Sequence, residues 1–79
     1  MNYQKLTIGQ MADLCQVSQQ TLRHYDAEGL LVPAVVDEKT GYRYYNIRQS
    51  ARLDMIQYMK TLDIGLKNIK SYLDNRDIN

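Results

Sequence analysis

LRHYDAEGLLVPAVVDEKTGYRYY, residues 22–45, joins the end of one expected helix to an expected β-hairpin. Polar, cationic and aromatic side chains lie on both parts. Arg23, His24 and Tyr25 stand near the end of the helix, and Arg43 follows the turn of the hairpin. Such groups donate hydrogen bonds to phosphate oxygens and to base edges. Two neighbouring elements that both carry them are typical of small proteins that bind a nucleic-acid duplex.

Two short helices are expected before the hairpin. Thr7 followed by Gln10 matches a capping box, so a first helix is expected to begin at about Ile8. Its apolar stripe, at the spacing i, i+3, i+4 and i+7, consists of Ile8, Met11, Ala12 and Cys15. Ser18 is a second N-cap candidate, and the next helix is expected from about residue 19 to residue 28. The two helices together predict a helix-turn-helix.

The hairpin is expected to form the first wing of this fold. Gly29 supplies the left-handed residue that ends the second helix. Pro33 then excludes helix, and the strand Ala34 to Val36 is expected to pair with the strand Tyr42 to Tyr45. The turn between these strands is expected at residues 37–41, with a positive φ at its glycine.

Two further helices are expected after the wing. Asn46 followed by Gln49 predicts the start of a third helix of about 15 residues, with apolar positions at Leu53, Ile56, Met59 and Leu62. A short fourth helix is expected over residues 66–73, and the polar tail 75–79 is expected to fray. The predicted fold class is therefore mainly α, a winged helix-turn-helix with four helices and a two-stranded β-hairpin wing, in one domain of residues 1–79.

The composition is that of an ordinary globular protein. Hydrophobic residues make up 44% of the chain and charged residues 24%. No apolar run approaches the roughly 18 residues of a membrane span, and the first ten residues lack the apolar core of a signal peptide, so no membrane partner and a cytoplasmic location are expected. The single cysteine, Cys15, cannot form an internal disulfide and is expected to be a buried, inert thiol.

The distribution of charge says more than the net charge. The formal net charge is +1 and the sequence pI is 7.8, below the value of about 9 that is usual for a basic nucleic-acid-binding domain. Residues 26–38 carry four acidic and no basic side chains, whereas residues 39–60 carry five basic side chains against Asp54 alone. The basic half coincides with the hairpin and the third helix. Without the aromatic and glycine context, solvated surface charge would explain this run equally well.

Taken in order, these motifs resemble the N-terminal domain of the MerR family of transcription regulators. The matching elements are an Ile-Gly opening helix, Leu-Arg-x-Tyr-Asp, Gly-Leu-Leu-x-Pro and Gly-Tyr-Arg-x-Tyr, and the resemblance covers about residues 6–74. It implies sequence-specific binding of double-stranded promoter DNA, with RNA polymerase at the same promoter. It also implies a homodimer through a long C-terminal helix, followed by an effector-binding region. Because both are absent from these 79 residues, this chain alone is expected to be monomeric.

The start of the second helix supplies the candidates for reading bases. In a helix-turn-helix these residues enter the major groove. Gln20 can pair with adenine and Thr21 can touch a thymine methyl group, with Ser18 beside them; simple exposure on a helix is the alternative. The resemblance places a DNA-contacting arginine at Arg23, for which an ion pair with Asp26 is the alternative.

The resemblance also implies contacts to the DNA backbone. Tyr42 and Arg43 match wing residues that touch the sugar-phosphate backbone, and strand alternation leaves some of the wing tyrosines to pack instead. Lys60, near the end of the third expected helix, matches a phosphate-contacting position at the start of the family's second wing, the region between the third and fourth helices. Solvent exposure is the alternative. Tyr25 either supports the core or donates to phosphate. His24 is expected to pack or cap rather than bind metal, because no second ligand stands nearby in the sequence.

Three positions depart from the family pattern. Asp63 stands where glycine is common, Gly65 stands where an N-cap residue with a hydroxyl or proline is usual, and Gln16 replaces the glycine or asparagine of the tight turn. Asp tolerates left-handed backbone and Gly is an acceptable cap, so the second wing is expected to survive. The rival functions are an excisionase-like DNA-bending protein and a winged-helix protein-interaction module. One His, one Cys and no Gly-rich phosphate loop predict neither enzyme nor cofactor.

Overall fold

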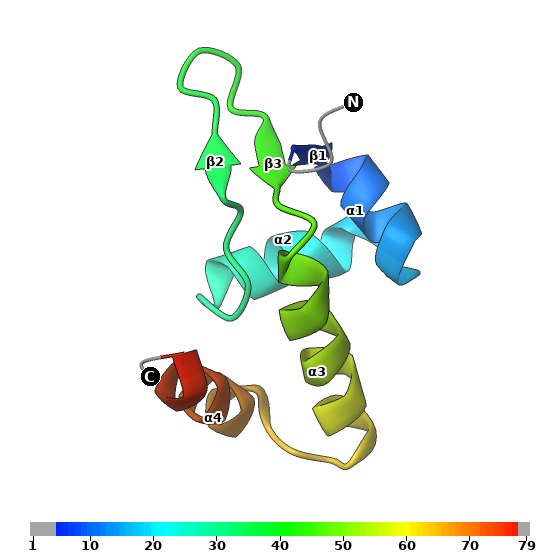
Figure 1. The fold of residues 1–79 in the computed structure, drawn as a ribbon, viewed down its shortest axis with the longest axis vertical. Coiled ribbons are helices and arrows are strands. Elements are labelled where there is room, and N and C mark those ends of the chain that lie inside the picture. Colours follow the sequence, from blue (N-terminus) through cyan, green and yellow to red (C-terminus); the bar gives the residue numbers. More distant parts are fainter. Residues whose placement is uncertain (1–4, 78–79) are drawn as a thin grey trace.

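The computed structural model describes residues 5–77, and the fold within them is mainly helical, as predicted (Figure 1). The elements follow in the order β1 (Leu6–Thr7), α1 (Ile8–Cys15), α2 (Gln19–Ala27), β2 (Val35–Val36), β3 (Arg43–Tyr45), α3 (Gln49–Thr61) and α4 (Leu66–Asp77). In Figure 1 the hairpin of β2 and β3 rises above α2, α3 descends from the hairpin, and α4 folds back beside α3. No helix among the described residues has the length and apolar character needed to cross a membrane.

The predicted caps set the starts of α1 and α2. The Thr7 hydroxyl accepts a hydrogen bond from the Gln10 amide at 3.1 Å, and the Gln10 side chain accepts from the Thr7 amide at 2.9 Å. The Ser18 hydroxyl accepts from the Thr21 amide at 3.0 Å. These bonds satisfy amides that would otherwise lack partners in the first turns of the helices. The predicted helix-turn-helix is confirmed.

Three helices end in the same way, with one residue in left-handed backbone. Gln16, Gly29 and Asp63 have φ values of 57°, 69° and 60°. The backbone amide of the residue that follows each of them donates a hydrogen bond to a carbonyl in the last turn of the helix. After Gly29, the Leu30 amide donates to the Tyr25 carbonyl at 2.8 Å. This is the closing pattern that positions the following apolar residue against the helix, and Leu30 is buried there. The expectations for Gly29 and Asp63 are confirmed.

Gln16→Gly should raise the free energy of unfolding by about 0.5–1 kcal/mol. A side chain in left-handed backbone costs roughly 1–2 kcal/mol, and glycine relieves this cost while adding conformational entropy to the unfolded chain. Gln16 is exposed, so its substitution removes little packing. Urea unfolding measures the difference. Gln16→Ala keeps the Cβ atom and is the control; an equal gain for alanine would contradict the backbone explanation.

The wing belongs to a three-stranded sheet rather than to the two-stranded hairpin that was expected. The strand order is β1-β3-β2, and all neighbours are antiparallel. Leu6 pairs with Tyr45, and Val35 pairs with Tyr44. Two residues are too few to show an alternating pattern, which is why β1 was missed. Gly41 in the connecting turn has the expected positive φ of 76°.

The last two helices differ from the prediction at their ends. The N-cap expected at Asn46 was wrong. The Asn46 side chain accepts a hydrogen bond from the Arg48 amide at 2.8 Å, and the Gln49 side chain accepts one from the Asn46 amide at 2.9 Å. These bonds close a turn, and the 13-residue α3 begins only at Gln49. Leu62, expected in the apolar stripe, is exposed. The expected fraying from Asn75 was wrong, since α4 continues to Asp77; residues 78 and 79 lie outside the described residues.

One apolar core lies between the helices and the inner face of the sheet. It gathers side chains from every helix, together with one strand residue and the loop after α2: Met11, Ala12, Leu22, Tyr25, Leu30, Leu31, Tyr45, Leu53, Ile56, Met59, Ile69 and Leu73. Cys15 packs against its edge and is only partly buried, so the expectation of full burial was wrong. Partial burial, followed by the nearby charge of Asp54, raises the pKa of the Cys15 thiol. Its expected inertness stays a prediction.

Candidate nucleic-acid interface

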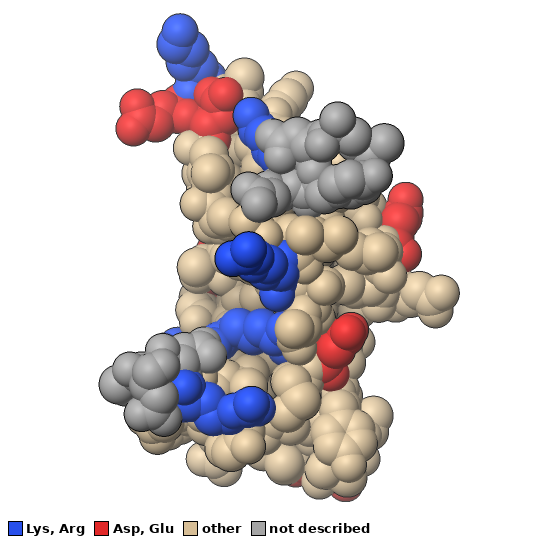
Figure 2. All heavy atoms as spheres, viewed as in Figure 1, with Lys and Arg blue, Asp and Glu red and all other residues tan. Residues whose placement is uncertain are grey.

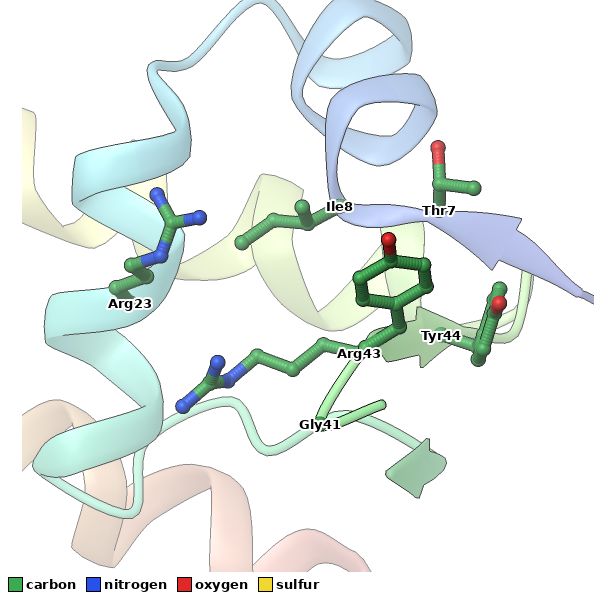
Figure 3. Close-up of a pocket in the computed structure, with 7 residues that line it drawn as sticks. Thr7, Ile8, Arg23, Gly41, Arg43 and Tyr44 are labelled. Carbon is green, nitrogen blue, oxygen red and sulfur yellow. The ribbon is translucent and has the colours of Figure 1, made fainter. Parts of the chain in front are cut away.

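Two arginines from different elements line one hollow between α2 and the wing. Arg23 comes from α2 and Arg43 from β3, and Figure 3 shows both side chains reaching into the space between the two elements. The hollow measures about 250 Å³, and its lining consists of Thr7, Ile8, Arg23, Gly41, Tyr42, Arg43 and Tyr44. The sequence indicated both arginines separately, and the fold brings them together at the edge of the helix-turn-helix. Two guanidinium groups at one hollow suit an anionic ligand.

Arg43 is held in this position by Asp26. Its Nε–H donates to Oδ2 of Asp26 at 3.0 Å, and the side chains of Arg43 and Asp26 are 38% and 24% exposed. Asp26 lies on α2, 17 residues before its partner. Among residues 5–76 the ion pair of Asp26 is therefore with the wing, and the alternative pairing of Asp26 with Arg23 is not formed.

The wing tyrosines separate into packed and exposed side chains, as strand alternation predicted. Tyr45 is fully buried in the core, whereas Tyr42 is exposed. Tyr44 is half-buried, and the ammonium of Lys5 lies 4.6 Å from its ring centre. The Tyr45 hydroxyl has no hydrogen-bond partner among the described residues, and burial, followed by the charge of Asp26, raises its pKa. Tyr42 is therefore the most exposed of the three wing tyrosines.

Tyr25 joins α2, the second helix of the helix-turn-helix, to α3 and to Lys60. Its ring is buried, which supports the core interpretation. Its hydroxyl donates to Oε1 of Gln57 at 2.9 Å and accepts from Nζ of Lys60 at 3.0 Å. The Lys60 ammonium also lies 5.4 Å from the centre of the Tyr25 ring. This contact fixes one end of a lysine that is otherwise exposed. DNA contacts of Tyr25 and Lys60 stay predictions.

The start of α2 presents Gln20, one of the three predicted base-reading candidates, next to a capping pair. The hydroxyls of Ser18 and Thr21 lie 2.9 Å apart and share a hydrogen bond, so both groups already serve the helix cap. Gln20 lies between them in the sequence and is exposed. Of the three predicted base-reading candidates, Gln20 has the reach and the paired donor and acceptor that adenine recognition needs.

A second cationic region lies apart from this interface. Figure 2 shows lysine and arginine gathered along the centre and lower part of one face. A groove of about 590 Å³ is lined by Arg48, Arg52 and Arg76, beside Met55 and Leu73. It shares no residue with the hollow between α2 and the wing.

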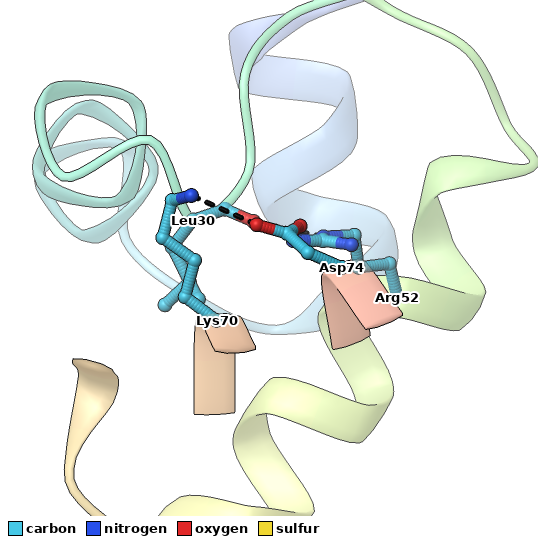
Figure 4. A network of polar contacts seen from close by, with 4 residues as sticks. All are labelled: Leu30, Arg52, Lys70 and Asp74. Carbon is cyan, nitrogen blue, oxygen red and sulfur yellow. Dashed lines mark hydrogen bonds and ion pairs between the residues drawn. The ribbon is translucent and has the colours of Figure 1, made fainter. Parts of the chain in front are cut away.

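Arg52 of this groove also ties α4 to the loop after α2 (Figure 4). Its guanidinium donates to the Leu30 carbonyl and to Asp74, both at 2.8 Å. Lys70 pairs with the same Asp74 at 2.8 Å, and the bonds from Lys70 and then Arg52 lower the pKa of Asp74. These contacts explain why α4 continues past Leu73 instead of fraying.

The described residues give no indication of a metal centre. No group of three or more His, Cys, Asp and Glu side chains lies close enough together among them to hold a metal ion. His24 is exposed, with its ring 6.0 Å from that of Tyr25. Sequence reasoning did not identify Asp26 as the partner of Arg43 or Gln57 as the partner of Tyr25. Both contacts cross long stretches of sequence, so no local pattern signals them.

Comparison with known proteins gives consistent matches. Residues 6–76 match the family described as MerR HTH family regulatory protein. The transcriptional regulator BrlR of Pseudomonas aeruginosa is 48% identical over 64 residues, which cover 81% of this chain and 24% of BrlR. The chain therefore spans about a quarter of the length of this relative.

Solved structures match over nearly the whole chain. The EcmrR–DNA complex in EcmrR-RPo has a TM-score of 0.84 at 30% identity and covers 89% of this chain and 26% of EcmrR. HiNmlR, a MerR family regulator lacking the sensor domain and bound to promoter DNA, has a TM-score of 0.78 at 32% identity and covers 95% of this chain and 59% of HiNmlR. Both similarities extend over the helix-turn-helix and the wing.

Proposed function

The chain belongs to the MerR family of helix-turn-helix regulatory proteins, and we propose that it binds promoter DNA through α2 and the wing of β2 and β3. It is the DNA-binding domain of a transcriptional regulator of this family. In the proposed complex α2 lies in the major groove, Gln20 reads a base edge, and Ser18 and Thr21 lie beside it. We treat residues 1–79 as one such domain.

The observation that carries this proposal is the hollow shared by Arg23 and Arg43. A guanidinium group can donate hydrogen bonds to two phosphate oxygens at once. The guanidinium groups of Arg23 and Arg43 lie on neighbouring elements, so together they bind the DNA backbone next to the groove that α2 enters. Tyr42 is exposed beside them and adds a phenolic donor. Lys60, anchored by Tyr25, supplies a phosphate contact at the second wing. In the proposed complex, contacts to the DNA backbone at both wings therefore lie on either side of the base contact of Gln20.

The larger assembly extends the same proposal. The relatives and solved structures favour a regulator over an excisionase-like bending protein, an interaction module or an enzyme. We propose that the whole protein acts in the bacterial cytoplasm as a homodimer at a promoter that RNA polymerase also occupies. The EcmrR–DNA complex in EcmrR-RPo supports the last point.

Arg43→Ala and Gln20→Ala should both weaken DNA binding, but they should differ in how the loss depends on DNA sequence and on salt concentration. The probe is a labelled duplex selected by the wild-type chain from a random-sequence pool, with an unselected duplex as comparison. Arg43→Ala should weaken both complexes by about tenfold and reduce the salt slope by about one counterion, because a phosphate contact is blind to sequence. Gln20→Ala should cost about 1–3 kcal/mol on the selected duplex only, with little change in slope.

Lys67→Ala is the control, because Lys67 is an exposed residue on α4, outside α2 and the wing, and lines neither of the two sites. It should change neither the affinity ratio of the two duplexes nor the affinity for the selected duplex by more than about twofold. A sequence-dependent loss for Arg43→Ala at unchanged salt slope would show that the wing reads bases. A wild-type chain that binds neither duplex would refute the proposed function.

A further inference from the structure

We propose that Asp26 is a positioning residue, which holds Arg43 in the orientation that binds a DNA phosphate. This inference rests on the proposed function and adds a residue that contacts no DNA itself. The starting observation is the 3.0 Å hydrogen bond from Nε of Arg43 to Oδ2 of Asp26, which joins the wing to the recognition helix. No other ion pair among the described residues connects β3 to a helix.

The hydrogen bond to Asp26 leaves the guanidinium of Arg43 able to bind a phosphate. Arg43 has five N–H donors, and Asp26 engages the one on Nε. The four donors on the two terminal nitrogens are left for the hollow that Arg23 also lines. A phosphate can accept from both terminal nitrogens at once, in the forked geometry that suits it. Asp26 and a phosphate therefore occupy different edges of the same guanidinium.

Fixing the side chain of Arg43 reduces the entropy that DNA binding has to remove. An arginine side chain has many rotamers, and an arginine free to rotate loses part of this rotamer entropy on contact. Arg43 is 38% exposed, so its own packing leaves it room to move, and Asp26 supplies the restraint. Because Asp26 lies on α2, the restraint also fixes the wing contact relative to the helix that reads bases.

Two simpler roles for Asp26 give different results. As a bare negative charge, it would repel phosphate, and any neutral residue would improve binding equally. As a structural link between wing and helix, it would support folding whether or not Arg43 binds DNA. Asn and Ala at position 26 separate these roles from positioning, because both remove the charge and only Asn keeps an oxygen that accepts from Nε.

The experiment compares Asp26→Asn and Asp26→Ala, each with Arg43 present and with Arg43→Ala, on the selected duplex at several salt concentrations. With Arg43 present, the Ala variant should bind about 3- to 10-fold more weakly than the Asn variant. It should also lose about one counterion from the salt slope, while the Asn variant keeps the wild-type slope. With Arg43→Ala, the Asn and Ala variants should bind equally, because no guanidinium remains to be positioned.

Equal affinities of the Asn and Ala variants with Arg43 present would overturn the inference and leave Asp26 as a mere charge. A difference that persists with Arg43→Ala would also overturn it and would assign Asp26 to folding. Should Asp26→Ala unfold, the Nε–H resonance of wild-type Arg43 decides: it should keep its shift when DNA is added, and movement to a phosphate-bonded shift would overturn the inference. Wild-type chain that binds no duplex would instead refute the proposed function on which the inference rests.

Discussion

Leu22→Ala should lower the free energy of unfolding by about 2–5 kcal/mol, because it leaves a cavity beneath the recognition helix. Leu22 is 0% exposed and packs in the core from α2. A domain of 79 residues has a total stability of only about 4–12 kcal/mol, so a loss of this size removes a large part of it. Urea unfolding followed by circular dichroism measures the change.

Leu14→Ala is the matched control for this loss. Leu14 makes the same change in side-chain volume from an exposed position, at 52% exposure on α1, and should shift stability by no more than about 0.5 kcal/mol. DNA binding by Leu22→Ala should fall only in proportion to the unfolded fraction, since this residue has no access to a ligand. Equal losses for the two variants, or a DNA-binding defect in fully folded Leu22→Ala, would contradict this account.

Local signals in the sequence predicted the helical part of the fold. The caps and the left-handed residue that begin or end α1 and α2 depend on neighbouring residues in the sequence, so their propensities operate without help from tertiary structure. The examples are Thr7 with Gln10, Ser18, and Gly29. The turn glycine Gly41 belongs to the same class. The predicted starts of α1 and α2 coincide with those in the structure.

Long-range pairings account for what the sequence did not predict. The strand β1 exists because Leu6 and Thr7 find β3 as a partner nearly 40 residues later, and two residues carry no periodicity of their own. The bonds of Asp26 to Arg43 and of Tyr25 to Gln57 likewise span 17 and 32 residues. Sequence reasoning therefore identified cationic groups of the candidate site, but not the residues that orient them.

The length of α4 is a further example, and it bears on assembly. The sequence predicted about two turns, yet the helix has 12 residues, because Lys70 and Arg52 both engage Asp74 in its last turns. We predict that the added length creates no dimer interface. Ile69 and Leu73 are buried in the core of their own domain, and Leu66 packs against it.

A helix fused to the C-terminus of each chain, chosen so that two copies pair as an antiparallel coiled coil, should therefore tighten DNA binding. On an operator with two half-sites the gain should be about 10²–10⁴-fold. With its apolar stripe already packed internally, α4 offers a second chain only scattered groups such as the half-exposed Tyr72. We expect the 79-residue chain to be largely monomeric in dilute solution and to bind one half-site weakly. The fusion makes the second half-site contact intramolecular, so the gain comes from effective concentration and needs no new DNA contact.

Sedimentation and binding to duplexes with one or two half-sites measure this effect. The control fusion carries prolines in the coiled coil and should restore the weak binding of the unfused chain. On a duplex with one half-site, both fusions should bind like the unfused chain, because tethering has no second site to engage. A stable dimer of the unfused chain would contradict the prediction and would show that a surface of this domain, such as the groove lined by Arg48, Arg52 and Arg76, joins two chains. Nanomolar binding by the unfused monomer would also contradict it, because one half-site would then be enough for tight binding.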